Sequence, residues 1–171
     1  MTEANAGRKE RVVALFYNFD DDLFLVEHAV DDGGVFRLWG FPSVERRRDI
    51  TDDTLETPLA AIRRIARERF DYAMDDANLA RCNHVLDTLE TAYQNILYEP
   101  FIVPVDDRTK LVPQPGVVAE WRTFAALVGF AERKLFPEAH VVFLNAANEY
   151  IAEHTTDVDG DEDPGDLGED S

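Results

Sequence analysis

One amphipathic helix, placed between two groups of apolar strand-like segments, restricts the folds open to this chain more than any other feature. Thr57 suits the N-cap position and Pro58 the first helical position, and the pattern predicts a helix that runs to about Phe70. At about 100° per residue, apolar and charged side chains separate onto two faces. The apolar face holds Leu59, Ala61, Ile62, Ile65, Ala66 and Phe70, and the charged face holds Arg63, Arg64, Arg67, Glu68 and Asp71.

Apolar and β-branched runs predict strands on both sides of this helix. Three precede it (residues 12–19, 23–30 and 35–41) and three follow it (residues 84–90, 96–105 and 117–121). Asp20-Asp21-Asp22 joins the first two runs and indicates a hairpin. Pro100 and Pro104 predict that their strand is an edge strand or a bulged one. Two closing helices are predicted over residues 124–135 and 138–154.

This order of elements predicts a single α/β domain. We expect the domain to cover residues 11–154, after an N-terminal extension of residues 1–10. Residues 155–171 are rich in Asp, Glu and Gly and have almost no apolar side chains, which predicts a disordered acidic tail whose role is solubility.

The charge balance narrows the classes of partner. A net charge of −18 argues against binding to nucleic acid or to a membrane surface, because both carry negative charge. The chain has no long apolar stretch, no signal-peptide pattern and one cysteine, Cys82, and these features predict a cytoplasmic protein. Only three of the 17 basic residues are lysines, and acidic pairs recur, so the composition resembles that of halophilic proteins, especially haloarchaeal ones.

Two motifs resemble the Nudix hydrolase family. Leu38-Trp39-Gly40-Phe41-Pro42 is similar to the strand end that precedes the Nudix box, and Ala60-Ala61-Ile62-Arg63-Arg64-Ile65-Ala66-Arg67-Glu68 is similar to the box helix. The resemblance covers roughly residues 11–154. It implies an α/β/α sandwich with a mixed β-sheet and hydrolysis of phosphoanhydride bonds in nucleoside diphosphate derivatives. It also implies Mg²⁺ or Mn²⁺ held by glutamates on the box helix, since hard cations prefer carboxylate oxygens.

The box departs from the family pattern at its carboxylates. With Arg63 aligned to the arginine of the box, Arg64 and Arg67 take two glutamate positions, and of these only Glu68 keeps its carboxylate. The resemblance therefore implies Glu56 and Glu68 as metal ligands, and Glu68 with Glu120 as catalytic residues. Glu90 or Glu99 could also supply a carboxylate. An arginine cannot bind a metal ion, so activity is predicted to be weak, altered or lost.

Two interpretations of the arginines stay open. In the first, Arg64 pairs with Glu68 and Arg67 with Asp71, each at i,i+4, and the pairs close the former metal site. In the second, an arginine-rich cluster binds the phosphate groups of a nucleotide derivative or another phosphorylated small molecule. That cluster comprises Arg46, Arg47, Arg48, Arg63, Arg64 and Arg67, with Arg69 beside them. A scaffold for protein interaction is a third possibility, and the sequence leaves the oligomeric state open.

The composition leads to a prediction about salt. Molar salt shortens the Debye length to about 3 Å and screens repulsion among the acidic side chains, so removing salt is expected to loosen the fold. Circular dichroism in molar and in near-zero potassium chloride measures this. A spectrum that is the same in both would contradict the halophilic interpretation.

Overall fold

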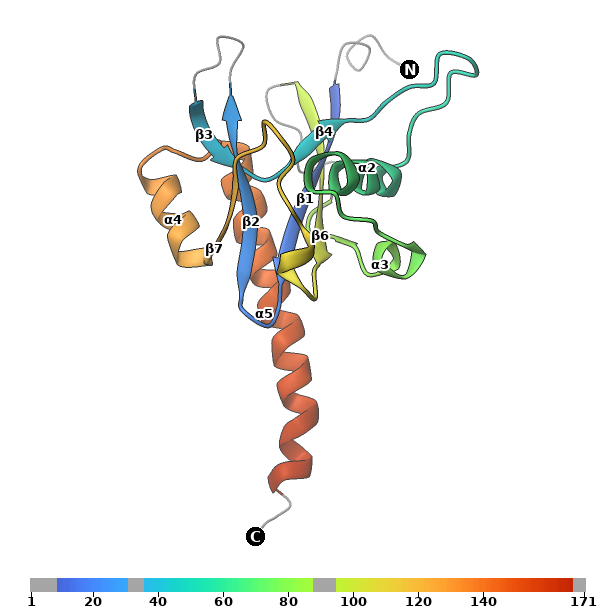
Figure 1. The fold of residues 1–171 in the computed structure, drawn as a ribbon. Helices are drawn as coiled ribbons and strands as arrows, with labels where there is room; N and C mark the ends of the chain where they lie inside the picture. Colours follow the sequence, from blue (N-terminus) through green and yellow to red (C-terminus); the bar gives the residue numbers. More distant parts are fainter. Residues whose placement is uncertain (1–8, 31–35, 88–94, 168–171) are drawn as a thin grey trace.

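A computed structural model describes residues 9–30, 36–87 and 95–167. Seven strands in these ranges form one mixed β-sheet (Figure 1). Its main path runs β3-β2-β1-β6-β5, with β4 paired to β1 and β7 paired to β2. The strands are β1 (Lys9–Asn18), β2 (Leu23–Val30), β3 (Phe36–Gly40), β4 (Ser43–Glu45), β5 (Asn83–His84), β6 (Ile96–Pro104) and β7 (Ala119–Arg122). The β1–β6 pair is parallel and the others are antiparallel.

Helices cover both faces of the sheet and make two apolar cores. On one face α2 (Pro58–Phe70) packs Ala61, Ile62 and Ile65 against Val12, Ala14 and Phe16 of β1. On the other face α4 (Phe124–Glu132) and α5 (Glu138–Leu167) cover Val13, Leu15 and Tyr17. The alternation of β1 side chains between the two cores makes it a strand buried on both faces. The predicted α/β class with a mixed sheet is confirmed.

Shorter helices are α3 (Asp76–Ala80) and the 3₁₀ turn η2 (Arg108–Lys110).

Helix α2 forms as its end signals predict. The Thr57 side chain accepts a hydrogen bond from the Ala60 N–H at 3.1 Å, and Asp71 ends the helix in a left-handed conformation. One residue differs from the predicted pattern, because Arg64 is 8 % exposed rather than on the solvent face.

Strands β1 and β2 are hydrogen-bonded only beside their connecting turn. Their register pairs Tyr17 with Phe24 and Asn18 with Leu23, and the strands then separate (Figure 1). Beyond that point β1 pairs with β4, from Arg11 to Val13, while β2 pairs with β3 and β7. The sheet therefore opens between two groups of strands.

A buried histidine holds the turn that crosses this opening, between β3 and β4. The Phe41 N–H donates a hydrogen bond to His140 Nδ1 at 3.0 Å, and the two rings stack with centroids 5.9 Å apart. A Cβ atom on Gly40 would lie 3.0 Å from His140 Nδ1, so a larger residue here would have to displace the buried His140 ring. The His140 ring thus joins α5 to the end of β3.

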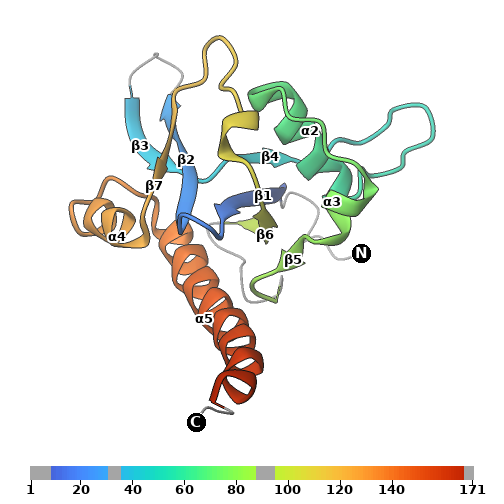
Figure 2. The same cartoon turned by 60° about the horizontal axis from the view of Figure 1, so that its bottom comes forward.

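Two further expectations differ from the structure. Strand β6 lies between β1 and β5, not at an edge, and tolerates its prolines because β5 pairs with only Ile102 and Phe101 in the part of the chain described. Helix α5 continues to Leu167, into the segment predicted to be disordered, and extends beyond the sheet (Figures 1 and 2). Adding residues to an existing helix avoids the cost of nucleation. Part of the predicted strand 84–90 lies outside the described residues.

No helix within the described ranges has both the length and the apolar character needed to span a bilayer.

The burial of His140 predicts sensitivity to acid. Burial lowers the pKa of His140 to about 3, and the nearby Arg11 acts in the same direction. An unfolded histidine has a pKa of about 6.5, so between roughly pH 6.5 and 3 the unfolded state binds a proton that the folded state does not. The free energy of unfolding should fall by up to about 1.4 kcal/mol per pH unit in this window from His140 alone.

His140→Asn keeps an acceptor for the Phe41 N–H but does not titrate, so we expect its stability to fall less steeply. Urea unfolding at pH 7 and pH 5 in molar potassium chloride measures the slope, with the exposed His84→Asn as control. Equal slopes for wild type and His140→Asn would refute this assignment.

Candidate functional site

A cleft of about 500 Å³ lies where β1 and β2 separate. Side chains and backbone from both faces of the sheet line it: Arg11, Glu27, His28, Trp39, Gly40, Phe41, Ser43, Arg69, Gly116, Val117, Val118, Pro137 and His140. Because each group of strands supplies one wall, the cleft is a direct consequence of the short β1–β2 pairing.

Two arginines converge on one backbone oxygen in this cleft. Arg11 on β1 donates from Nη2 to the Ser43 carbonyl at 3.1 Å, and Arg69 on α2 donates from Nη2 to the same carbonyl at 2.9 Å. Arg11 also contacts the Ser43 hydroxyl oxygen, at 3.0 Å from Nη2. The second arm of the Arg69 guanidinium, Nη1, pairs with the carboxylate of Glu27 on β2. The cleft therefore holds two guanidinium groups and one carboxylate.

Burial dominates the electrostatics of this group. It lowers the pKa of Arg11, a shift that the nearby Glu45 carboxylate opposes. It also raises the pKa of Glu27, although the Arg69 guanidinium acts in the opposite direction. Charged groups in partly buried positions are poorly screened by salt, so these side chains keep their influence at high ionic strength.

Aromatic rings form another part of the cleft wall. His28 and Trp39 lie with ring centroids 3.6 Å apart, and Trp39 stacks on Phe130 at 5.7 Å. Phe41, which stacks on the His140 ring, also lines the cleft. The cleft thus combines an apolar wall with a cationic one, an arrangement suited to a ligand that has both characters.

The α2 residues that align with the Nudix box lie at a different place, beside the base of the Arg46–Glu56 loop. Arg64 donates from Nε to Glu56 Oε2 at 2.9 Å and from Nη2 to Glu56 Oε1 at 2.8 Å. Nη2 also donates to the Glu45 carbonyl at 2.9 Å. The predicted pairing of Arg64 with Glu68 is therefore wrong, because the loop brings a carboxylate into a better position than the helix does.

The Arg64–Glu56 ion pair is well shielded. The two side chains are 9 % and 15 % exposed. Burial alone would raise the pKa of Glu56, but hydrogen bonds from Arg64 and from the Arg47 N–H outweigh it and leave the pKa below its ordinary value. The pKa of Arg64 is raised by its hydrogen bond to Glu56.

The other predicted arginines are spread over several partners. Arg46 contacts Glu10 at 2.8 Å and Glu99 at 3.5 Å, and Arg47 contacts Glu68 at 3.7 Å. Arg48 pairs with Asp53 and Arg63 with Asp76. Arg67 is exposed and makes no side-chain ion pair with a described residue, so the predicted pair with Asp71 is not formed. The arginines are adjacent in sequence, yet most are already paired with carboxylates.

The carboxylates implied as metal ligands do not fit a divalent ion. Both oxygens of Glu56 accept hydrogen bonds from Arg64, and Glu68 lies against Arg47. Within the described ranges, no group of three or more His, Cys, Asp and Glu side chains is placed to hold a metal. Mg²⁺ needs several oxygen ligands, whereas two guanidinium groups flank the glutamates here.

Glu120 lies on the opposite face of the sheet from Glu68. It is in register with Val26, which belongs to the core under α4 and α5, and it pairs with Arg122, which lies over the Trp39 and Phe130 rings. Glu99 is engaged by Arg46 and His84. Glu90 lies outside the described residues. The structure therefore does not bring Glu68 and Glu120 together.

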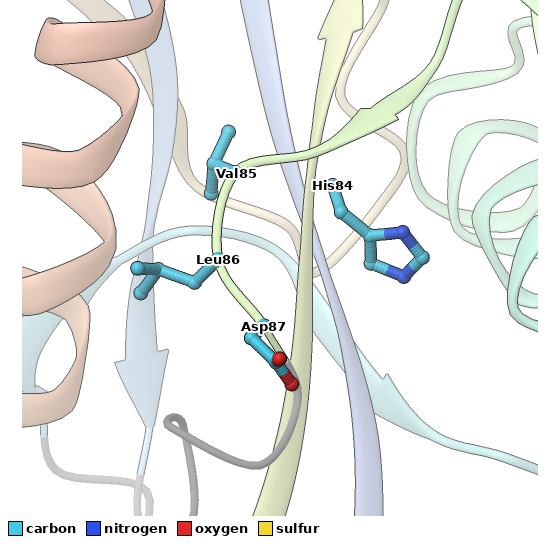
Figure 3. Close-up of a pocket in the computed structure, with 4 residues that line it drawn as sticks. All are labelled: His84, Val85, Leu86 and Asp87. Carbon is cyan, nitrogen blue, oxygen red and sulfur yellow. The ribbon is translucent and has the colours of Figure 1, made fainter.

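A second hollow, of about 480 Å³, borders residues 84–87. Its four labelled side chains point in different directions, with Leu86 toward α5 and His84 away from it (Figure 3). They do not converge on a common point as the groups of a binding site would.

Sequence reasoning missed Arg11 and Glu27 and left Arg69 at the margin of its cluster. Glu27 had a detectable signal, because it is a charged residue within the apolar run Leu23–Val30. Arg11 near the start of β1 carried no comparable signal, because its contacts with Ser43 arise only when β4 pairs with β1.

Comparison with solved structures identifies the fold as the Nudix fold. The Nudix domain of Shewanella oneidensis NrtR, solved with ADP ribose, is similar with a TM-score of 0.60 and 14 % identity, over 88 % of this chain and 99 % of that one. An ADP compounds hydrolase has a TM-score of 0.58 and 16 % identity, over 85 % and 74 %. A MutT of Aliivibrio salmonicida or Vibrio cholerae has a TM-score of 0.55 and 15 % identity, over 81 % and 93 %. No protein-family model matches the sequence, and no curated protein matches it.

The Arg64–Glu56 contact predicts a stability effect. Arg64→Gln leaves the Glu56 carboxylate shielded and without its main partner, so we expect a loss of about 3 kcal/mol in the free energy of unfolding. Arg64→Lys keeps the charge but cannot donate in a bidentate manner, so its loss should be smaller. Urea unfolding in molar potassium chloride measures both.

Arg48→Gln is the control, because the exposed pair of Arg48 with Asp53 should contribute within about 0.5 kcal/mol. If Arg64→Gln is no less stable than Arg48→Gln, the contact does not stabilise the fold.

Proposed function

We propose that this protein binds a phosphorylated nucleotide derivative in the cleft between β1 and β2, and that Arg11 and Arg69 contact its phosphate groups without a divalent ion. The observation that carries the proposal is the convergence of these two guanidinium groups on the Ser43 carbonyl inside a cleft of about 500 Å³.

The chemistry of the guanidinium group supports this choice. Its planar fork of N–H donors matches phosphate oxygens and stays charged, so two such groups can take the role that a cation has in holding a diphosphate. Two guanidinium groups on one carbonyl oxygen are unusual in a chain with a net charge of −18 and only 17 basic residues. The aromatic wall with Trp39 and His28 offers apolar surface for the nucleoside part.

The similar structures support the class of ligand. One was solved with ADP ribose and another is described as an ADP compounds hydrolase. Binding without metal-dependent hydrolysis is favoured here because Glu56 is engaged by Arg64. Cytoplasmic location and halophilic origin remain separate predictions.

Calorimetric titration with ADP-ribose in molar potassium chloride and EDTA tests the proposal. We expect binding by the wild type and a loss of about tenfold or more in affinity for Arg69→Gln, because a hydrogen bond to a charged group contributes about 1.5–3 kcal/mol. Arg81→Gln, whose exposed ion pair with Asp106 lies outside the cleft lining, should bind as the wild type does.

Arg63→Gln separates this proposal from binding by the arginine-rich cluster of the sequence prediction. Affinity lost in Arg63→Gln and kept in Arg69→Gln would move the site to the outer surface of α2. Release of AMP that needs Mg²⁺ or Mn²⁺ and disappears in Glu68→Gln would instead establish metal-dependent hydrolysis, with Glu68 as the residual ligand.

A further inference from the structure

Glu27 is a carboxylate in a cationic part of the cleft. It lies on β2 between Val26 and His28, and its side chain is 18 % exposed. Its register partners on the neighbouring strands are Gly40 and Ala119, neither of which offers a charged side chain. The charged groups that act on Glu27 are Arg69 of α2 and Arg11 of β1.

The contact between Glu27 and Arg69 joins the two sides of the cleft. Arg69 reaches from the C-terminal turn of α2 to the Ser43 carbonyl with Nη2 and to Glu27 with Nη1. Its side chain is 28 % exposed, so the guanidinium remains reachable from the cleft. One carboxylate thus occupies the arm of Arg69 that a bound anion would need.

From this arrangement we infer that Glu27 is an internal competitor for the anion site. Its carboxylate holds Arg69 in the free protein, and a ligand phosphate takes its place on Arg69 when it binds. The inference rests on the proposed function and adds regulation of ligand affinity to it. Affinity then depends on the difference in free energy between the Arg69–phosphate pair and the Arg69–Glu27 pair.

The competition favours a particular class of ligand. When a ligand with a single weakly charged group displaces Glu27, Arg69 exchanges one ion pair for a similar one, and little binding free energy is gained. A diphosphate brings more negative charge and more acceptor oxygens, and it can engage Arg11 and Arg69 together. We therefore expect the site to prefer diphosphate derivatives over inorganic phosphate and carboxylates.

Removing the competing charge tests the inference. Glu27→Gln keeps the shape of the side chain but leaves Arg69 without its anionic partner, so affinity for inorganic pyrophosphate and for ADP-ribose should rise by about tenfold. Glu99→Gln is the matched control: Glu99 also lies on a strand, is 15 % exposed and pairs with an arginine, Arg46, so its loss should leave affinity unchanged. Calorimetric titration in molar potassium chloride and EDTA gives the affinities.

Each outcome decides between the two proposals. Tighter binding by Glu27→Gln, or binding by that variant alone, supports the competition. If the wild type binds, Arg69→Gln weakens binding and Glu27→Gln does not strengthen it, the competition is overturned while the proposed function stands. If neither the wild type nor Glu27→Gln binds, both are overturned.

A folding defect is checked by thermal unfolding of each variant. Should Glu27→Gln fail to fold, Glu27→Asp provides the test, because its shorter side chain reaches Arg69 less well and should raise affinity to a smaller extent. Unchanged affinity in a folded Glu27→Asp would then overturn the competition.

Discussion

Strand β1 pairs with three other strands along its length, and the arrangement of the whole molecule depends on this sharing. Its parallel pairing with β6 runs along nearly the full strand, whereas β2 pairs with only two of its residues and β4 takes the same edge farther along. Both faces of β1 are buried, one under α2 and the other under α4 and α5. Because β2 leaves β1 so early, the sheet opens without losing either core, and the opening becomes the cleft.

Charge pairing determines which of the many ionised groups are available for binding. On the outer side of α2 and in the Arg46–Glu56 loop, most arginines already face a carboxylate. A buried pair such as Arg64–Glu56 is costly to break from one side, although it is weak evidence for net stabilisation. In the cleft, by contrast, Arg11 and Arg69 share the Ser43 carbonyl, with Glu27 on Arg69 and Glu45 near Arg11. Two guanidinium groups side by side stand out in a strongly acidic chain.

Local signals predicted local structure well. The Thr57 cap, Pro58 and the apolar spacing were sufficient for α2, and the two runs around Asp20–Asp22 were sufficient for the β1–β2 turn. The same kind of reasoning failed for Arg64, because an i,i+4 argument considers one helix and Glu56 comes from a loop. It also misplaced β6, whose prolines are tolerated since β5 is so short. Short elements such as β4 and α3 had too few residues to show a period.

Hydrophobic period, helix-end signals and charge are properties of neighbouring residues, and they were sufficient to predict the α/β class, the main helix with its caps, and the acidic surface. Which charges meet was settled by the packing of distant segments. Arg11, Glu27 and Arg69 are far apart in the chain and come together because β1, β2 and α2 border the same opening. Likewise Glu68 and Glu120 are separated by the sheet. Contacts between distant segments depend on strand pairing and packing, which no local pattern of residues specifies.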